Sequence, residues 1–120
     1  MGKQLAKVVG ILIVALALCV SVVAKAADAP AIKVGAIFAV TGGAANLGGP
    51  EKKTAEMLVE KINKEGGVNG QKIELIVMDS GGKPETAISL AKQLIEEKNV
   101  LAIIGPSTSG ETMAIKNICQ

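Results

Sequence analysis

Strand-like and helix-like segments alternate three times along residues 32–120, and this alternation restricts the fold more than any other feature. Residues 32–40 and 72–79 are long apolar runs of the kind found in buried strands, and residues 100–104 form a shorter one. Short polar or glycine-rich loops separate these runs from amphipathic segments. Such alternation predicts an α/β fold in which helices cover both faces of a doubly wound parallel sheet.

The helices are expected at residues 50–65, 84–99 and 111–118. Pro50 and Pro84 suit a first helical turn, and apolar residues then recur on one helical face. The four glycines of the preceding residues 41–49 predict a loop there. Three strands and three helices make an incomplete βαβαβα sheet, so we expect a truncated chain that is poorly stable alone or associates.

The first 26 residues have the composition of an export signal. Two early lysines precede an almost unbroken apolar run at 8–24, which ends in Ala24-Lys25-Ala26. This pattern predicts a signal peptide cleaved after Ala26, a tether at 27–31 and a periplasmic mature protein. Two alternatives stay open: a membrane anchor, since the run is near the ~17-residue lower limit for spanning, and a lipid anchor at Cys19, which the large Leu18 before it disfavours.

Composition argues against several function classes. Beyond residue 26 the chain has ten lysines, eleven acidic residues and one aromatic residue, Phe38, so nucleic-acid binding has little support. The absence of histidine excludes Ser-His, Cys-His and histidine-ligated metal sites, which argues against an enzyme. The glycines of 41–49 do not fit a dinucleotide-binding loop, so no cofactor is expected and Asp79 is interpreted as a loop acid. Cys119 is expected to be a small buried hydrophobe.

The loops after the three strands are the places where a ligand can bind, because ligands of open α/β sheets bind at the carboxyl ends of the strands. Residues 105–110 place Ser107, Thr108 and Ser109 before the third helix. Their hydroxyls, with free backbone N–H groups, can hold an anion such as a carboxylate. The spacing of Thr108 and Glu111 equally fits a capping box, and Ser107 or Ser109 can also cap.

Several short motifs together resemble the periplasmic branched-chain amino acid-binding proteins in order and spacing. They are Ile32-Lys33-Val34-Gly35 followed by Thr41-Gly42; Ile62-Asn63-x-x-Gly66-Gly67-Val68-Asn69-Gly70; Asp79 followed by Pro84-Glu85-x-Ala87; and Ile103-Ile104-Gly105-Pro106-x-x-Ser109. The resemblance covers residues 32–120. It implies the start of lobe one of a two-lobed, non-enzymatic binding protein that closes around an amino acid and delivers it to the permease of an ABC importer.

The resemblance also assigns roles to individual residues. It implies that Ser109 binds the α-carboxylate of the ligand and that Leu47 lies where the first loop offers a side chain, often aromatic, to the cleft. Ser107 and Thr108 complete the candidate ligand-binding set. A disulfide that some relatives form at the position of Thr108 is absent, because the chain has threonine there. A ligand-sensing domain of a signalling protein remains an alternative on the same fold, and a nucleotide-dependent α/β enzyme is a more distant one.

Overall fold

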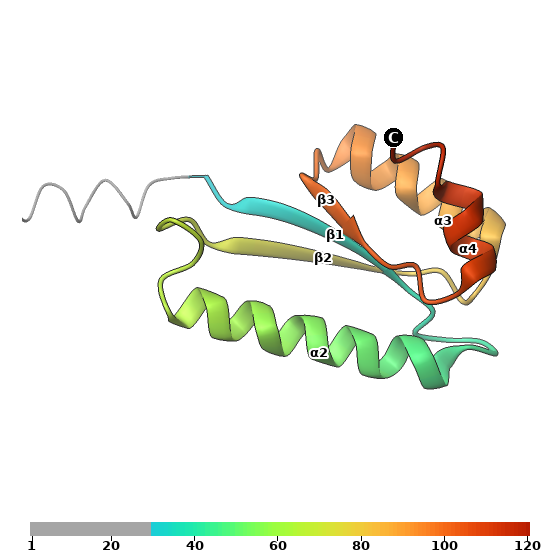
Figure 1. Cartoon of the computed structure of the whole chain (residues 1–120), viewed down its shortest axis with the longest axis horizontal. Coiled ribbons are helices and arrows are strands. Elements are labelled where there is room, and N and C mark those ends of the chain that lie inside the picture. The colour runs from blue at the N-terminus through green and yellow to red at the C-terminus, as the bar shows by residue number, and fades with distance from the viewer. Residues whose placement is uncertain (1–29) are drawn as a thin grey trace, which may run out of the picture. The chain divides into compact units, whose positions relative to one another are not determined.

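The computed structural model describes residues 30–120, which form a three-stranded parallel sheet with helices on both faces (Figure 1). The strand order is β2-β1-β3, with β1 (Ile32–Phe38) between β2 (Ile73–Asp79) and β3 (Ala102–Ile104). Seven residue pairs join β1 to β2 and three join β1 to β3. The predicted α/β class with a parallel sheet is confirmed, and β3 is its short edge strand.

The helices divide between the two faces of the sheet. The long helix α2 (Ala45–Lys64) lies along one face, whereas α3 (Pro84–Lys92), the π-helical turn η1 (Gln93–Glu97) and α4 (Ser109–Ile115) lie on the other (Figure 1). The core forms under α3 and α4. Its fully or nearly buried members are Ile37, Ala87, Ala91, Leu94 and Ile115.

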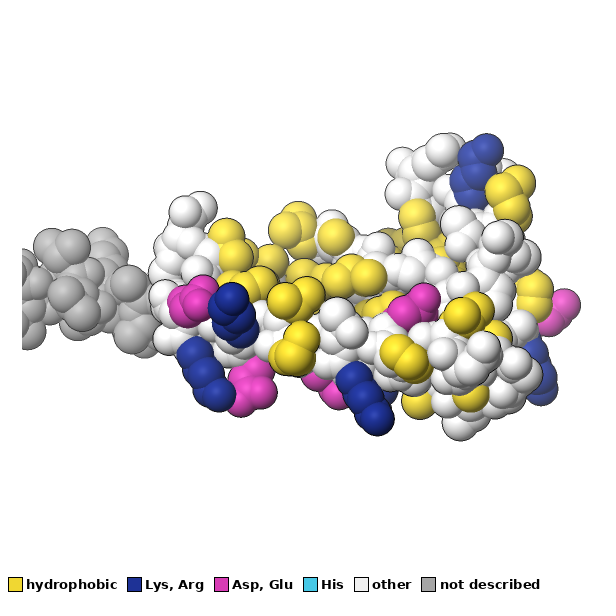
Figure 2. Space-filling view, turned by 60° about the horizontal axis from the view of Figure 1, so that its bottom comes forward, with side chains coloured by type: hydrophobic (Ala, Val, Ile, Leu, Met, Phe, Trp, Pro, Cys, Tyr) yellow, Lys and Arg dark blue, Asp and Glu magenta, His cyan; other side chains and the backbone are white. Residues whose placement is uncertain are grey.

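Helix α2 covers its face more loosely than α3 and α4 cover theirs. Its only buried residue is Gly48, and Met57 and Leu58 are 61% and 48% exposed. Lysine and acidic side chains line the outer side of the helix (Figure 2), and two pairs form i,i+4 ion pairs, Lys52–Glu56 and Lys64–Glu60. The charges of this helix thus form a solvated face, and such exposed pairs add little stability.

The expected loop over residues 41–49 is correct for residues 41–44 and wrong for 45–49, because α2 begins at Ala45 rather than at Pro50. Two glycines account for the difference. A Cβ at position 48 would lie 2.3 Å from the backbone of Ala39, so only glycine lets the helix approach the end of β1 so closely. A residue before proline is normally pushed out of helical geometry by its Cβ, and Gly49 has none. Pro50 therefore lies inside the helix.

The other boundaries differ from expectation by a few residues. The strands end or begin up to two residues inside the expected limits, and α4 covers 109–115 instead of 111–118. Cys119, expected to be buried, is exposed. The predicted signal peptide and most of the tether lie outside the described residues. None of the helices described between residues 30 and 120 combines the length and apolar character needed to cross a bilayer.

Candidate functional site

The candidate site lies at the carboxyl edge of the sheet, between the segments that follow β1 and β3. These two strands are neighbours, yet the helices that follow them, α2 and α4, lie on opposite faces (Figure 1). A change of face between neighbouring strands opens a crevice at their carboxyl ends, which is where ligands of open α/β sheets bind. The topology thus brings residues 39–44 and 105–110 to one edge.

Asp79, at the end of β2, holds the segment that follows β1. Its Oδ1 accepts hydrogen bonds from the backbone N–H groups of Val40 (2.9 Å), Thr41 (3.2 Å) and Gly81 (2.9 Å), and the Thr41 hydroxyl donates to its Oδ2 at 2.6 Å. The Thr41 hydroxyl, followed by the Gly81 N–H, lowers the pKa of Asp79. This acid therefore ties two loops together, in agreement with its interpretation as a loop acid.

Ser107 joins three elements at the same edge. Its hydroxyl accepts a hydrogen bond from the N–H of Ala39 at 3.0 Å and donates to Oε2 of Glu51 on α2. The end of β1, the start of α2 and the β3–α4 loop are thus fixed to one another through one oxygen. Because the single hydroxyl proton is already donated to Glu51, Ser107 can donate to a ligand carboxylate only if that bond breaks.

Thr108 is the N-cap of α4. Its hydroxyl accepts a hydrogen bond from the Glu111 N–H at 3.4 Å and donates to Oε2 of Glu111 at 2.6 Å. The capping interaction expected from the spacing is confirmed. Glu111 is fully buried, and its Oε1 has no partner within the described part of the chain. The Thr108 hydroxyl therefore provides a hydrogen bond to one oxygen of the buried Glu111 carboxylate. The same hydroxyl holds the β3–α4 loop to the start of α4.

Ser109, the first residue of α4, differs from Ser107 and Thr108 in its hydrogen bonding. It is exposed, as is Gly110, and its hydroxyl forms no hydrogen bond to any residue of the described range 30–120. The bonds at Ser107 and Thr108 fix the loop on its N-terminal side. The structure thus leaves one of the three candidate hydroxyls open to solvent on a fixed loop.

Leu47 lies in the first turns of α2 and is 47% exposed. It precedes Glu51 by four residues, which places the two on the same side of the helix. Since Glu51 contacts Ser107, this side of α2 adjoins the β3–α4 loop. Leu47 therefore lies on the helix side that borders the candidate site, although within a helix and not in the expected loop.

Sequence reasoning missed two side chains that hold the site. Thr41 binds Asp79 across 38 positions, and Glu51 binds Ser107 across 56. Neither pair has a local spacing signal, because the contacts depend on how the strands are ordered. Among residues 30–120, no group of three or more His, Cys, Asp or Glu side chains is placed to hold a metal ion.

Comparison with known proteins identifies the family that has this architecture. The sequence profile described as periplasmic binding protein matches residues 31–120. The chain belongs to the periplasmic binding protein family. Periplasmic binding proteins bind solutes, and the parallel sheet with helices on both faces agrees with the solved relatives.

Two relatives are similar to this chain over most of its length. A Leu/Ile/Val-binding protein homolog 7 from Brucella suis is 37% identical over 101 residues, which cover 83% of this chain and 25% of the relative. The Leu/Ile/Val-binding protein BraC3 of Rhizobium johnstonii is 32% identical over 105 residues, 84% of this chain and 28% of the relative. This periplasmic binding protein chain thus spans about a quarter of the length of these relatives.

One solved relative includes a ligand. It is the branched-chain amino acid transporter substrate binding protein LivJ from Streptococcus pneumoniae, in complex with isoleucine. Its structure superposes with a TM-score of 0.69 at 37% identity, and the match covers 70% of this chain and 24% of that one. The resemblance inferred from the short motifs is therefore confirmed at the level of family and fold.

Proposed function

We propose that residues 30–120 form the part of an extracytoplasmic amino acid receptor that binds the ligand carboxylate, with Ser109 as the contact. One observation carries the proposal: of three neighbouring hydroxyls at the carboxyl edge, two bond to the protein and that of Ser109 faces solvent. A hydroxyl that directly follows a loop fixed by the bonds of Ser107 and Thr108 is preorganised, so little entropy is lost when a ligand binds. Leu47 borders the site and supplies apolar surface for a ligand side chain.

A branched-chain or related amino acid is the proposed ligand class; an amide is the secondary alternative, because it lacks the carboxylate that Ser109 is proposed to bind. The names of the Brucella and Rhizobium relatives refer to leucine, isoleucine and valine, and the Streptococcus relative was solved with isoleucine. Sequence identities of 32–37% support this class of ligand but do not single out one amino acid within the class. Delivery to the membrane permease of an ABC importer and a periplasmic location belong to the same proposal, together with the signal peptide expected at residues 1–26.

A receptor without catalytic activity is the proposed role for this segment. The chain has no histidine, and its carboxylates at the carboxyl edge are used as loop ties: Asp79 binds Thr41, Glu51 binds Ser107 and Glu111 binds Thr108. No pair of carboxylates at this edge is left for general acid and base work. These features support binding in place of catalysis.

The proposal is tested by titrating the isotope-labelled chain with isoleucine while recording backbone amide shifts by NMR. Isoleucinamide is the matched control, since it has the same side chain and ammonium group but lacks the carboxylate. Isoleucine is expected to shift the amides of residues 107–111 and isoleucinamide is not. Equal responses to both compounds, or no response at residues 107–111, would contradict carboxylate binding at this loop.

In a complete receptor, the contact between Ser109 and the ligand carboxylate should contribute measurably to the binding affinity. A hydrogen bond to a charged group contributes roughly 1.5–3 kcal/mol, so Ser109→Ala is expected to weaken amino acid binding by about tenfold to a hundredfold. A receptor in which residues 31–120 replace the matching segment of the Streptococcus protein provides the background for this measurement, by calorimetric titration with isoleucine.

A further inference from the structure

The two halves of the candidate site belong to different elements of the fold. Ser109, the carboxylate contact of the proposed function, begins α4, whereas Leu47 lies near the start of α2. These two helices cover opposite faces of the sheet (Figure 1). The distance between Leu47 and Ser109 therefore depends on the contacts that join α2 to the segment running from β3 into α4.

A single side-chain hydrogen bond makes this connection. The Ser107 hydroxyl donates to Oε2 of Glu51, which lies one helical turn after Leu47 on the same side of α2. Among residues 30–120, it is the only hydrogen bond between α2 and residues 102–115. Both Glu51 and Ser107 are half-buried, so water competes less for this bond than it does at an exposed surface.

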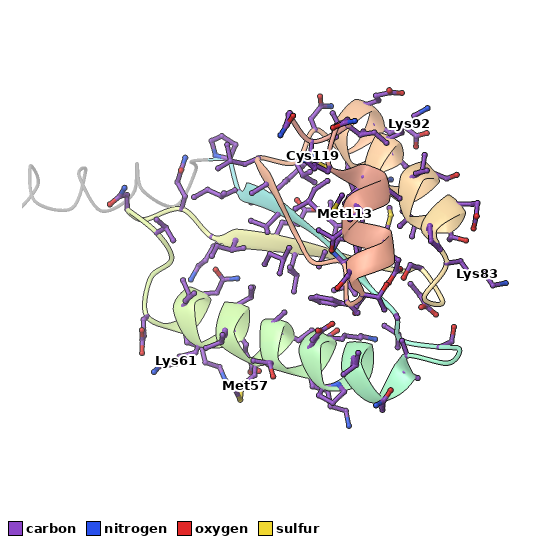
Figure 3. The ribbon with its side chains drawn as sticks, turned by 45° about the vertical axis from the view of Figure 1, so that its right-hand side comes forward. Met57, Lys61, Lys83, Lys92, Met113 and Cys119 are labelled. Atoms are coloured by element: carbon purple, nitrogen blue, oxygen red, sulfur yellow. The ribbon has the colours of Figure 1, made fainter. Side chains whose placement is uncertain are left out.

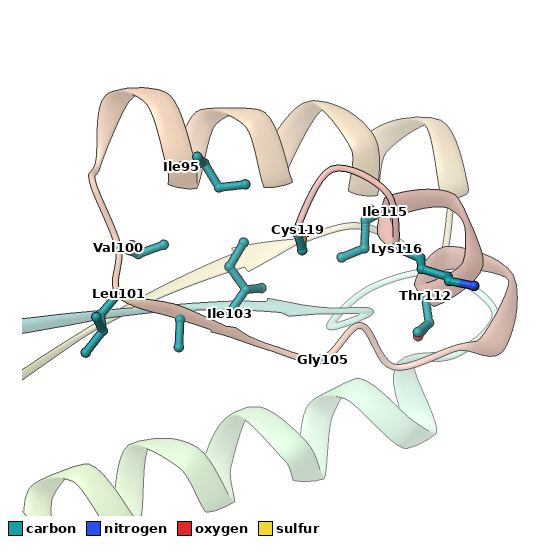
Figure 4. A pocket seen from close by; sticks show the side chains of 10 residues that line it. Ile95, Val100, Leu101, Ile103, Gly105, Thr112, Ile115, Lys116 and Cys119 are labelled. Carbon is teal, nitrogen blue, oxygen red and sulfur yellow. The ribbon is translucent and has the colours of Figure 1, made fainter.

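The segment from β3 to α4 is held on both sides of Ser109. Gly105 lies close against β1, because a Cβ at this position would lie 2.3 Å from a backbone oxygen of that strand (Figure 4). Beyond Ser109, the N–H and the hydroxyl of Thr112 (Figure 4) both donate to the carbonyl of Thr108, each at 3.0 Å. Since the chain between these contacts has little slack, a displacement of Ser107 also displaces Ser109.

The start of α2 is likewise fixed against the segment that follows β1. A Cβ at Gly48 would lie 2.3 Å from the backbone of Ala39, so the helix lies directly against this residue. The N–H of Ala39 donates to the Ser107 hydroxyl at 3.0 Å. Ala39, α2 and Ser107 thus form a closed set of contacts, in which the length of the Glu51 side chain sets the spacing between the helix and the loop.

We propose that Glu51 is a positioning residue of the amino acid site, which acts on the ligand only through Ser107. Its carboxylate sets the spacing between Leu47, which borders the ligand side chain, and Ser109, which binds the ligand carboxylate. The role requires a hydrogen-bond acceptor at the reach of a glutamate side chain and does not require a negative charge. This inference rests on the proposed function, because it presupposes that the ligand lies between Leu47 and Ser109.

Two substitutions of Glu51 separate reach from charge. Glu51→Asp keeps the charge but shortens the side chain by one methylene group, whereas Glu51→Gln keeps the length and an oxygen that accepts from Ser107. Titration of the full isotope-labelled chain with isoleucine, followed at the amides of residues 107–111, gives the affinity of the folded molecules. Glu51→Asp is expected to bind about tenfold more weakly than the wild type, and Glu51→Gln to within about threefold of it.

Glu60 provides the matched control on the same helix. It follows Glu51 by nine residues, about two and a half turns, and therefore lies on the opposite side of α2. Met57 and Lys61, three residues before it and one after it, point away from the sheet (Figure 3). Glu60 itself is exposed and pairs with Lys64 at 2.6 Å. Glu60→Asp and Glu60→Gln should both bind isoleucine as the wild type does.

The Ser107→Ala background shows whether Glu51 acts through Ser107. There Glu51→Asp should have no further effect on the affinity, because the hydroxyl that it would displace is gone. The proposal is overturned if Glu51→Asp weakens binding equally with and without the Ser107 hydroxyl, if Glu51→Gln binds as weakly as Glu51→Asp or more weakly, or if both variants bind as the wild type does. These results would leave the proposed function standing. A wild type without any isoleucine response at residues 107–111 would overturn the proposed function, and the positioning role with it.

Discussion

Two loops at the same edge of the sheet use their polar groups differently. The β2–α3 loop is tied to its neighbours by Asp79, which accepts four hydrogen bonds. The β3–α4 loop has three consecutive hydroxyl residues, of which Ser107 and Thr108 bond to the protein and Ser109 is exposed. The contrast separates residues that hold loops from a residue that is available to a ligand. Substitutions in the first group should affect stability, and substitution of Ser109 should affect binding.

The largest expected effect is at Gly48, which sets the distance between α2 and the end of β1. A Cβ there would lie 2.3 Å from the Ala39 backbone, and backbone atoms cannot yield as a flexible side chain does. Gly48→Ala is expected to lower the free energy of unfolding by about 3 kcal/mol, at the upper end of overpacking effects. It should also displace the Ser107 hydroxyl, because this hydroxyl accepts a hydrogen bond from the Ala39 N–H.

Gly110→Ala is the control, because a Cβ at this helical position meets nothing within 4 Å. We expect no loss of stability, and a gain of up to about 1 kcal/mol. Chemical denaturation of both variants at one protein concentration provides the comparison. Equal effects at positions 48 and 110 would contradict the close approach of α2 to β1.

A smaller loss is expected at Thr108, which caps α4 and binds the buried Glu111. Thr108→Ala removes the cap, at a cost of about 1 kcal/mol, and leaves a buried carboxylate without its hydroxyl partner, which adds about 1 kcal/mol more. Thr108→Ser keeps the hydroxyl and should restore most of the stability. Thermal and denaturant unfolding of the two variants measure these stability losses. An equal loss of stability in Thr108→Ala and Thr108→Ser would contradict the stabilising role of the hydroxyl.

Asp79→Asn should cause a loss of about 1 kcal/mol at neutral pH, since the amide is a weaker acceptor and the site is exposed to solvent. The loss should depend on pH. Because the folded-state pKa of Asp79 is lowered, the stabilisation is present above the unfolded-state pKa of about 3.9 and disappears as pH falls through the folded-state value. Denaturant titrations at pH 7 and pH 3 should show the difference between wild type and Asp79→Asn shrinking. A difference that is the same at both pH values would contradict the role of the carboxylate.

Local patterns predicted much of this structure and failed where distant segments meet. The apolar runs identified the strands, and the spacing of Thr108 and Glu111 identified the cap, because both signals lie within a few residues. The start of α2 was missed because it depends on the contact of Gly48 with Ala39. The same holds for the bond between Glu51 and Ser107, which only the fold brings together. Ser109 was among the candidates from sequence, but its exposure beside two occupied hydroxyls needed the structure.

The most direct test of the account compares Ser109→Ala with Ser107→Ala in one set of measurements, unfolding free energy and the amide response to isoleucine. Ser109→Ala should keep the stability of the wild type to within about 0.5 kcal/mol, as exposed substitutions do, and lose the carboxylate-dependent shifts at residues 107–111. Ser107→Ala should lose about 1 kcal/mol of stability, because the Ala39 N–H and Glu51 lose their partner. Undiminished shifts in Ser109→Ala, or a stability loss as large as that of Ser107→Ala, would contradict the division between holding and binding residues.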